Sequence, residues 1–187
     1  VIARVREPGS MVASQSTVYS LSLDKPVYVR AYIGEPDLGR IAPGTAVRDL
    51  GGTFRWAEGP VWDKAHDQLL FSDVPENVVH AWNPDKGYRV FLKPSGCTSP
   101  NPAAREPGSN GLAFDAKGNL LLCEHGDRRV SRYVAGQGKT TLADRHQGKR
   151  LNSPNDVVAR SDGNLFFTDP PYGLPNLTEG KELPFQG

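Results

Sequence analysis

The sequence predicts an all-β fold built from repeated units of short antiparallel strands, of the kind found in β-propellers. Three stretches of the chain carry this prediction. Residues 110–124 and 155–169 align without a gap, and residues 58–73 match both after a turn one residue longer. Each copy holds two apolar strands joined by a polar turn. A repeat at a fixed period, with a hairpin in each unit, is typical of propeller blades.

The strands of each unit follow from apolar runs bounded by Gly, Pro, Asn and Asp. The first unit is expected at about 45–94, with strands at 59–62, 68–72, 78–83 and 88–92. The second is expected at 109–144, with strands at 111–114, 120–124, 129–134 and 140–144. The third begins at 155, contributes strands at 156–159 and 165–168, and is incomplete at residue 187.

Residues 1–44 do not follow the repeat and are expected to form an N-terminal extension. Two segments there, 16–22 and 27–33, have strand composition, and 34–44 is a Pro- and Gly-rich linker. Because closed propellers need about four to eight blades, a chain with about three is expected to be the N-terminal part of a larger propeller.

Composition narrows the classes of function. The 187 residues carry 22 basic and 21 acidic side chains, a net charge of +1 with no basic stripe, so no nucleic-acid partner is expected. The apolar runs are too short to span a membrane. Cys123 lies in an apolar strand and is expected to be a buried thiol, whereas Cys97 lies in a loop. A disulfide between them stays open, as do the cytoplasmic or periplasmic location and the oligomeric state.

One column of the aligned repeats suggests a metal site. Glu58, Asn110 and Asn155 occupy the same position in the three copies, at the start of the first strand. The first strand of every propeller blade lines the central channel, so equivalent positions point at one place on the axis. One carboxylate and two amide oxygens suit a hard cation such as Ca²⁺, and Zn²⁺ or Mg²⁺ are the alternatives.

Other interpretations of these residues stay open. Asn155 is also a turn former ahead of a strand, and Asn110 precedes Gly111, a common turn pair. A second column, formed by Asp73, Glu124 and Asp169, lies at the end of the second strand, where acids are expected to cap turns.

Several motifs resemble the gluconolactonase, regucalcin and senescence-marker-protein family. They are Glu-Gly-Pro-Val-Trp at 58–62, Ser-Asn-Gly-Leu-Ala-Phe-Asp at 109–115, Cys-Glu-His-Gly-Asp-Arg-Arg-Val at 123–130, Ser-Pro-Asn-Asp-Val-Val at 153–158 and Phe-Thr-Asp-Pro-Pro-Tyr-Gly at 167–173. The resemblance implies a six-bladed β-propeller with an axial divalent metal, usually calcium, that hydrolyses sugar lactones such as gluconolactone and related esters.

The resemblance also assigns roles to individual residues. Glu58 matches the family's first-blade metal carboxylate, and Asn155 matches the Asn that lies by the metal and contacts substrate or a bound water. Asn110 matches a second-blade channel position that varies in the family. The family's remaining ligands, an Asn and the Asp proposed as general base, are expected beyond Gly187. Ser153 replaces an Arg of the regucalcin pattern, for which Arg150 is only a loose substitute.

The sequence therefore predicts a metal-dependent lactone hydrolase, with a small-molecule lactone as its partner. His125 and Arg150 are further candidates for lining the channel mouth. Two alternatives remain: a non-catalytic propeller that binds calcium or a partner, and a related hydrolase acting on phosphotriesters or other esters.

Overall fold

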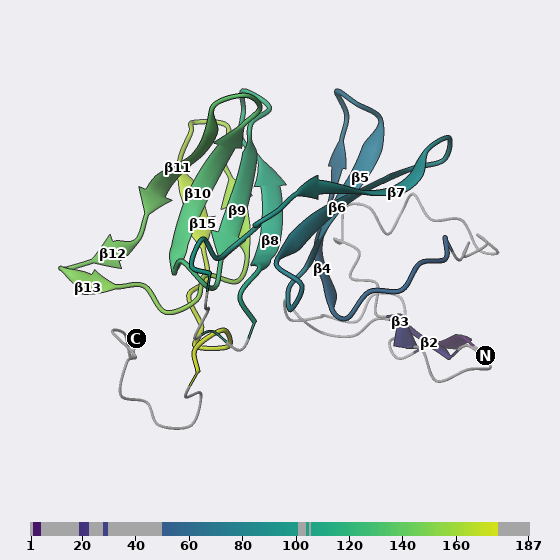
Figure 1. Ribbon diagram of the computed structural model, residues 1–187, viewed down its shortest axis with the longest axis horizontal. Coiled ribbons are helices and arrows are strands. Elements are labelled where there is room, and N and C mark those ends of the chain that lie inside the picture. The colour runs from purple at the N-terminus through teal and green to yellow at the C-terminus, as the bar shows by residue number, and fades with distance from the viewer. Residues whose placement is uncertain are drawn as a thin grey trace. The chain divides into compact units, whose positions relative to one another are not determined.

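The computed structural model describes residues 2–4, 19–22, 28–29, 50–100, 104 and 106–175, and it divides into two compact units, Val1–Leu50 and Gly51–Gly187 (Figure 1). The first unit contains a three-stranded antiparallel sheet of β1 (Ile2–Arg4), β2 (Tyr19–Ser22) and β3 (Tyr28–Val29). β2 and β3 fall inside the predicted strands, and β1 was not predicted. The linker predicted at 34–44 and the boundary predicted after residue 44 lie outside the described residues.

The second unit begins with a four-stranded antiparallel sheet, in the order β4-β5-β6-β7. Its strands are β4 (Ala57–Asp63), β5 (Gln68–Asp73), β6 (Val78–Asn83) and β7 (Gly87–Leu92). Every bound lies within two residues of the predicted one. The polar turns between the apolar runs therefore locate the strand ends correctly.

A second four-stranded sheet follows, formed by β8 (Ser109–Phe114), β9 (Leu120–Glu124), β10 (Arg129–Val134) and β11 (Gly138–Ala143). β14 (Val157–Ala159) pairs with β15 (Leu165–Phe167) in a third sheet. Between them, β12 (Arg145–His146) and β13 (Lys149–Arg150) form an exposed hairpin that was not predicted. Figure 1 shows this hairpin projecting from the β8–β11 sheet.

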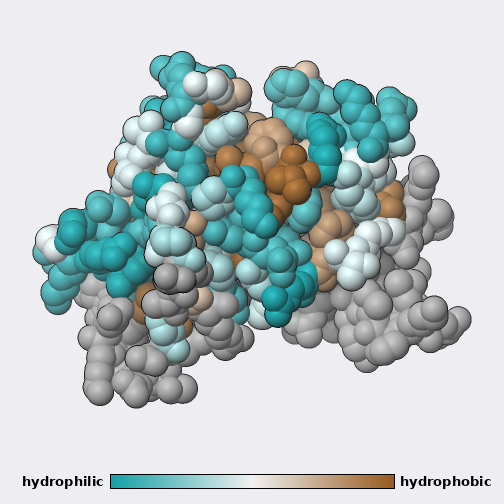
Figure 2. All heavy atoms as spheres, in the orientation of Figure 1, coloured by the Kyte–Doolittle hydropathy of each residue, from teal (hydrophilic) through white to brown (hydrophobic). Residues whose placement is uncertain are grey.

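Three sheets of the second unit pack face to face, and we call them the first (β4–β7), the second (β8–β11) and the third (β14–β15). Strand β9 contributes buried side chains to both faces of the second sheet. Successive side chains of a strand point to opposite faces. Leu120 and Leu122 pack with Leu70 and Ala81 of the first sheet, at a boundary that we call the first seam. Leu121 and Cys123 pack with Val157 of the third sheet, at the second seam. Figure 2 shows apolar residues between the two four-stranded sheets.

The described residues are all-β: among them there is no helix, and hence none that could cross a membrane. Two four-stranded sheets and a two-stranded one agree with repeated β-units. The number of blades and the closure of the ring remain predictions.

Candidate functional site

The three residues of the predicted metal column lie at the same end of their sheets. Glu58 on β4 pairs with Ser72 near the end of β5, Asn110 is the second residue of β8, and Asn155 comes two residues before β14. All three are half-buried. The register shifts directly after Glu58 in β4, between Glu58 and Val61, and around Asn110 in β8, between Ser109 and Leu112. Bulges of this kind re-aim side chains and are common next to active sites.

The backbones of the three positions interlock through these bulges. A Cβ on Gly59 would lie 2.3 Å from the carbonyl oxygen of Asn110, and Gly59 has a φ of 57°. The N–H of Gly111 donates to the carbonyl oxygen of Asn155 at 2.7 Å, and a Cβ on Gly111 would lie 2.5 Å from that oxygen. Each bulge glycine therefore allows its sheet to approach the next column residue directly.

Glu58 is oriented by a tryptophan. The indole Nε1 of Trp56 donates to Oε1 of Glu58 at 2.8 Å, and Trp56 is 46% exposed. Its polar contact with Glu58 holds the carboxylate in one orientation at the edge of the site.

The donor set fits a hard cation. One carboxylate and two amide side chains at interlocked positions provide oxygen ligands and one negative charge. Within residues 50–100, 104 and 106–175, no three His, Cys, Asp or Glu side chains are grouped closely enough to hold a metal ion.

Two acids of the second column cap the backbone at the entry of the first strand. Asp73 accepts hydrogen bonds from the N–H groups of Arg55 and Trp56, at 3.0 and 3.2 Å. Asp169 accepts one from the N–H of Asn152 at 2.8 Å. Burial raises the pKa of Asp169, against the lowering effect of this hydrogen bond. Both acids therefore cap backbone N–H groups in the segment before the first strand of their sheet, whereas turns between strands were the predicted target.

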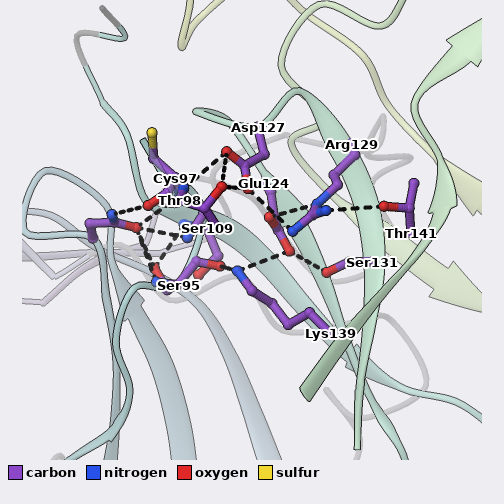
Figure 3. Close-up of polar contacts among 12 residues, drawn as sticks. Ser95, Cys97, Thr98, Ser109, Glu124, Asp127, Arg129, Ser131, Lys139 and Thr141 are labelled. Carbon is purple, nitrogen blue, oxygen red and sulfur yellow. Dashed lines mark hydrogen bonds and ion pairs between the residues drawn. The ribbon is translucent and has the colours of Figure 1, made fainter. Parts of the chain in front are cut away.

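Glu124, the third acid, has a different role. It is fully buried, and its carboxylate is surrounded by partners from β10 and β11 (Figure 3). Nε of Arg129 donates to Oε2 at 2.9 Å, Nζ of Lys139 lies 3.2 Å from Oε1, and Ser131 donates to the same oxygen. A carboxylate with this many partners serves the packing of the second sheet.

His125 lies in the second sheet's turn after β9 and is 1% exposed. A Cβ on Gly173 would lie 2.7 Å from its Cβ, and Oε2 of Glu106 lies 4.0 Å from its Nδ1. Burial lowers the pKa of His125 to about 4, so the imidazole is neutral at neutral pH. The structure places this side chain inside the packing, and its role at the channel mouth remains a prediction.

Arg150 is exposed on β13, and its Nη2 donates to the backbone carbonyl of Asp127 at 2.8 Å. It lies five residues before Asn155, and whether it reaches a substrate remains a prediction. Cys97 and Cys123 are both buried free thiols, so the alternative of a disulfide is wrong. Burial raises the pKa of Cys123, and the nearby charge of Asp156 raises it further.

Sequence reasoning missed the buried hydroxyls beside Asn110. Ser72 and Ser109 are both 0% exposed, and Oγ of Ser72 donates to the carbonyl of Asn110 at 2.9 Å. The signal in the sequence is weak, because Ser72 lies in an apolar strand and aligns with Cys123 in the next copy.

Comparisons with known proteins agree with this architecture. The family model for the SMP-30/Gluconolactonase/LRE-like region matches residues 56–182. A gluconolactonase of Zymomonas mobilis subsp. mobilis is 42% identical over 148 residues, which cover 76% of this chain and 42% of that protein. A UPF0194 membrane protein of Enterobacter sp. (strain 638) is 51% identical over only 47 residues, 25% of this chain and 14% of that protein.

Two solved structures are similar as well. A gluconolactonase of Xanthomonas campestris, described as important in glucose secondary metabolic pathways, has 36% identity and a TM-score of 0.58, over 73% of this chain and 42% of that one. A putative gluconolactonase has 34% identity and a TM-score of 0.61, over 82% and 49%. The chain thus spans less than half the length of these relatives. On the extent of these matches, the chain belongs to the SMP-30/gluconolactonase/LRE-like family.

Proposed function

We propose that the protein is a lactone hydrolase of the gluconolactonase type, which uses a divalent cation, Ca²⁺ by preference, held by Glu58, Asn110 and Asn155. One observation carries the proposal: the bulge glycines Gly59 and Gly111 let the backbone of each sheet approach the column residue of the next, at one end of the sheets. The names of the relatives supply the substrate class, a sugar lactone.

The chain's own residues suit this chemistry. Glu58 supplies the negative charge that two neutral amides lack, and Trp56 fixes its orientation. The amide NH₂ of Asn155 remains available to donate to a lactone oxygen when its Oδ1 faces the cation. A divalent cation bound there supplies Lewis acidity, which favours negative charge on the lactone carbonyl oxygen as water adds.

The test measures lactone opening and Ca²⁺ binding in the purified protein. Chelation should abolish hydrolysis, and restored Ca²⁺ should recover it. Glu58→Gln removes the only charge of the donor set and should weaken Ca²⁺ binding by at least about 10-fold. Glu76→Gln is the matched control, because Glu76 is an exposed acid of the same sheet whose carboxylate pairs with Arg55 at 3.1 Å.

The remaining outcomes separate the alternatives. Hydrolysis that ignores both the chelator and Glu58→Gln rejects the proposal. Ca²⁺ binding that Glu58→Gln weakens, without hydrolysis of any lactone, favours a non-catalytic calcium-binding protein. Phosphotriester hydrolysis faster than lactone hydrolysis moves the protein to the related esterase class. Zn²⁺ and Mg²⁺ in place of Ca²⁺ identify the preferred ion.

A further inference from the structure

We propose that Ser72 and Ser109 form a buried hydroxyl pair that positions Asn110 for the cation, so that both serines are positioning residues of the site. The inference rests on the proposed function. It adds two residues that touch neither the cation nor the substrate and act through the backbone of Asn110.

The geometry fixes the direction of the hydrogen bonds. Oγ of Ser72 lies 2.9 Å from the carbonyl oxygen of Asn110 and 2.8 Å from Oγ of Ser109. A hydroxyl has one proton. The carbonyl oxygen can only accept, so Ser72 donates its proton there. Ser109 must then donate its own proton to Oγ of Ser72, and the two hydroxyls form a chain that ends on Asn110.

Asn110 needs such a donor because of its place in the β-bulge. Ser109 pairs with Glu124 and Leu112 pairs with Leu122, so the ladder to β9 is interrupted between them. The carbonyl of Asn110 instead faces the first sheet, beside Gly59. A buried carbonyl without a donor is costly, and a residue in a bulge has no ladder partner to hold its direction. Ser72 supplies that partner from β5.

The pair is itself held from the loop before β8. The N–H of Ser109 donates to Oγ of Ser95 at 3.0 Å, and Nζ of Lys139 donates to the carbonyl of Ser95 at 3.0 Å. Lys139 is in turn paired with the buried Glu124 (Figure 3). Ser95 and Lys139 therefore hold Ser109 in place, while the hydrogen bond to Asn110 itself comes from Ser72. Residues of the first and the second sheet jointly set the orientation of one column residue.

The experiment compares Ser72→Ala with Ser131→Ala. Both serines are 0% exposed and hydrogen-bonded, but Ser131 bonds Glu124 and not Asn110. Ca²⁺ affinity is measured by calorimetry well below the thermal midpoint, where both variants are folded. Ser72→Ala should weaken Ca²⁺ binding by about 10-fold. Ser131→Ala should lower the thermal midpoint and leave the affinity within about twofold.

Two further variants keep the test decisive. Ser72→Thr retains the hydroxyl and should recover most of the affinity. Ser109→Ala leaves the bond from Ser72 to Asn110 in place and should weaken binding by about threefold, which serves if Ser72→Ala does not fold. Wild-type affinity in Ser72→Ala, or an equal loss in Ser131→Ala, overturns the inference. Wild-type affinity in Glu58→Gln instead overturns the proposed function.

Discussion

An asparagine of the predicted metal column lies at each of the two seams, and its backbone carbonyl accepts a hydrogen bond from a different kind of donor at each. At the first seam, the carbonyl of Asn110 accepts a hydrogen bond from the hydroxyl of Ser72. At the second seam, the carbonyl of Asn155 accepts one from the backbone N–H of Gly111. Both carbonyls lie against a bulge glycine of the preceding sheet. The close approach is therefore the repeated feature, and the donor is free to differ between copies.

The aligned positions explain why the donors differ. Ser72 and Ser109 of the first seam correspond to Cys123 and Pro154 of the second. A thiol is a weak donor, and the proline side chain has no hydroxyl, so the second seam cannot build the hydroxyl pair. The second seam relies on backbone alone, whereas the first adds side chains that one substitution can remove.

The largest expected effect comes from a substitution that prevents the close approach of two sheets at the first seam. Gly59→Ala places a methyl 2.3 Å from the carbonyl oxygen of Asn110, at a φ of 57°. We expect a loss of about 3 kcal/mol in the free energy of unfolding, from the clash and from the left-handed backbone together. Urea denaturation measures it. Gly118→Ala is the control, because Gly118 has a φ of 80° but nothing within 4 Å of its added Cβ. Equal losses at both glycines would mean that close approach at the seam is unimportant.

The next prediction concerns the pH dependence of stability that His125 contributes. His125 packs against Gly173 in the segment after β15, whereas the aligned residue after β5 is the apolar Val74. The folded pKa of His125, about 4, lies below its ordinary value of 6.5. Its neutral form is favoured in the fold, so its contribution is complete above pH 6.5 and is lost as the pH falls toward 4. The loss reaches up to about 3 kcal/mol.

Denaturation of the wild-type protein and of His125→Gln across pH 4–7 measures this contribution. The variant should have a flatter profile than the wild type, and the exposed His146 is the control when replaced in the same way. Parallel profiles for the wild type and His125→Gln would show that His125 makes no pH-dependent contribution to stability.

The acids of the second column sharpen the comparison further. The positions three residues before Glu58, Asn110 and Asn155 are Arg55, Pro107 and Asn152. Pro107 has no N–H, and the N–H of Gly108 donates to the carbonyl oxygen of Val74 at 2.8 Å. Glu124 therefore lacks the backbone donors that Asp73 has, and it binds Lys139 instead. Lys139→Met should cost about 2 kcal/mol in unfolding free energy, since it leaves a buried carboxylate with fewer partners.

Asp73→Asn is the corresponding change in the first sheet. The amide oxygen still accepts one of the two backbone hydrogen bonds, so the expected loss is about 1 kcal/mol. Thermal unfolding of the two variants side by side tests the difference. A larger loss for Asp73→Asn would show that the capping acid matters more than the buried charged network.

The smallest expected effect comes from a substitution that gives the first seam a side chain of the second. Ser72→Cys installs at the first seam the side chain that the second seam has at Cys123. We expect Ca²⁺ affinity to fall by about threefold, which is less than for Ser72→Ala, because a thiol is a weak donor. Calorimetry measures it. An affinity equal to that of Ser72→Ala would show that a thiol gives no support at all.

Much of the fold follows from local patterns in the sequence. The strands of both four-stranded sheets lie within two residues of their predicted bounds, because apolar runs and turn residues are local signals. The alignment of the copies also predicts that Glu58, Asn110 and Asn155 share one end of the sheets. The hairpin at 145–150 was missed, because its charged residues have no apolar alternation.

The support of the site could not be predicted, because it depends on distances between sheets. Ser72 reads as one polar residue in an apolar strand, and only the packing of β5 against β8 brings it to Asn110. His125 lies in a motif that suggests an open channel, yet the approach of Gly173 buries it. The structural preferences of Ser72 and His125, taken residue by residue, do not predict these contacts with Asn110 and Gly173.

The double-faced burial of β9 has a consequence for how this protein can change over time. All five of its residues are buried, and alternate ones belong to different cores. A deletion of one residue within 120–124 would send every downstream side chain of the strand to the opposite neighbour. Insertions and deletions should therefore survive in the turns, as between the first and second copies, while β9 accepts only substitutions that suit both neighbours together.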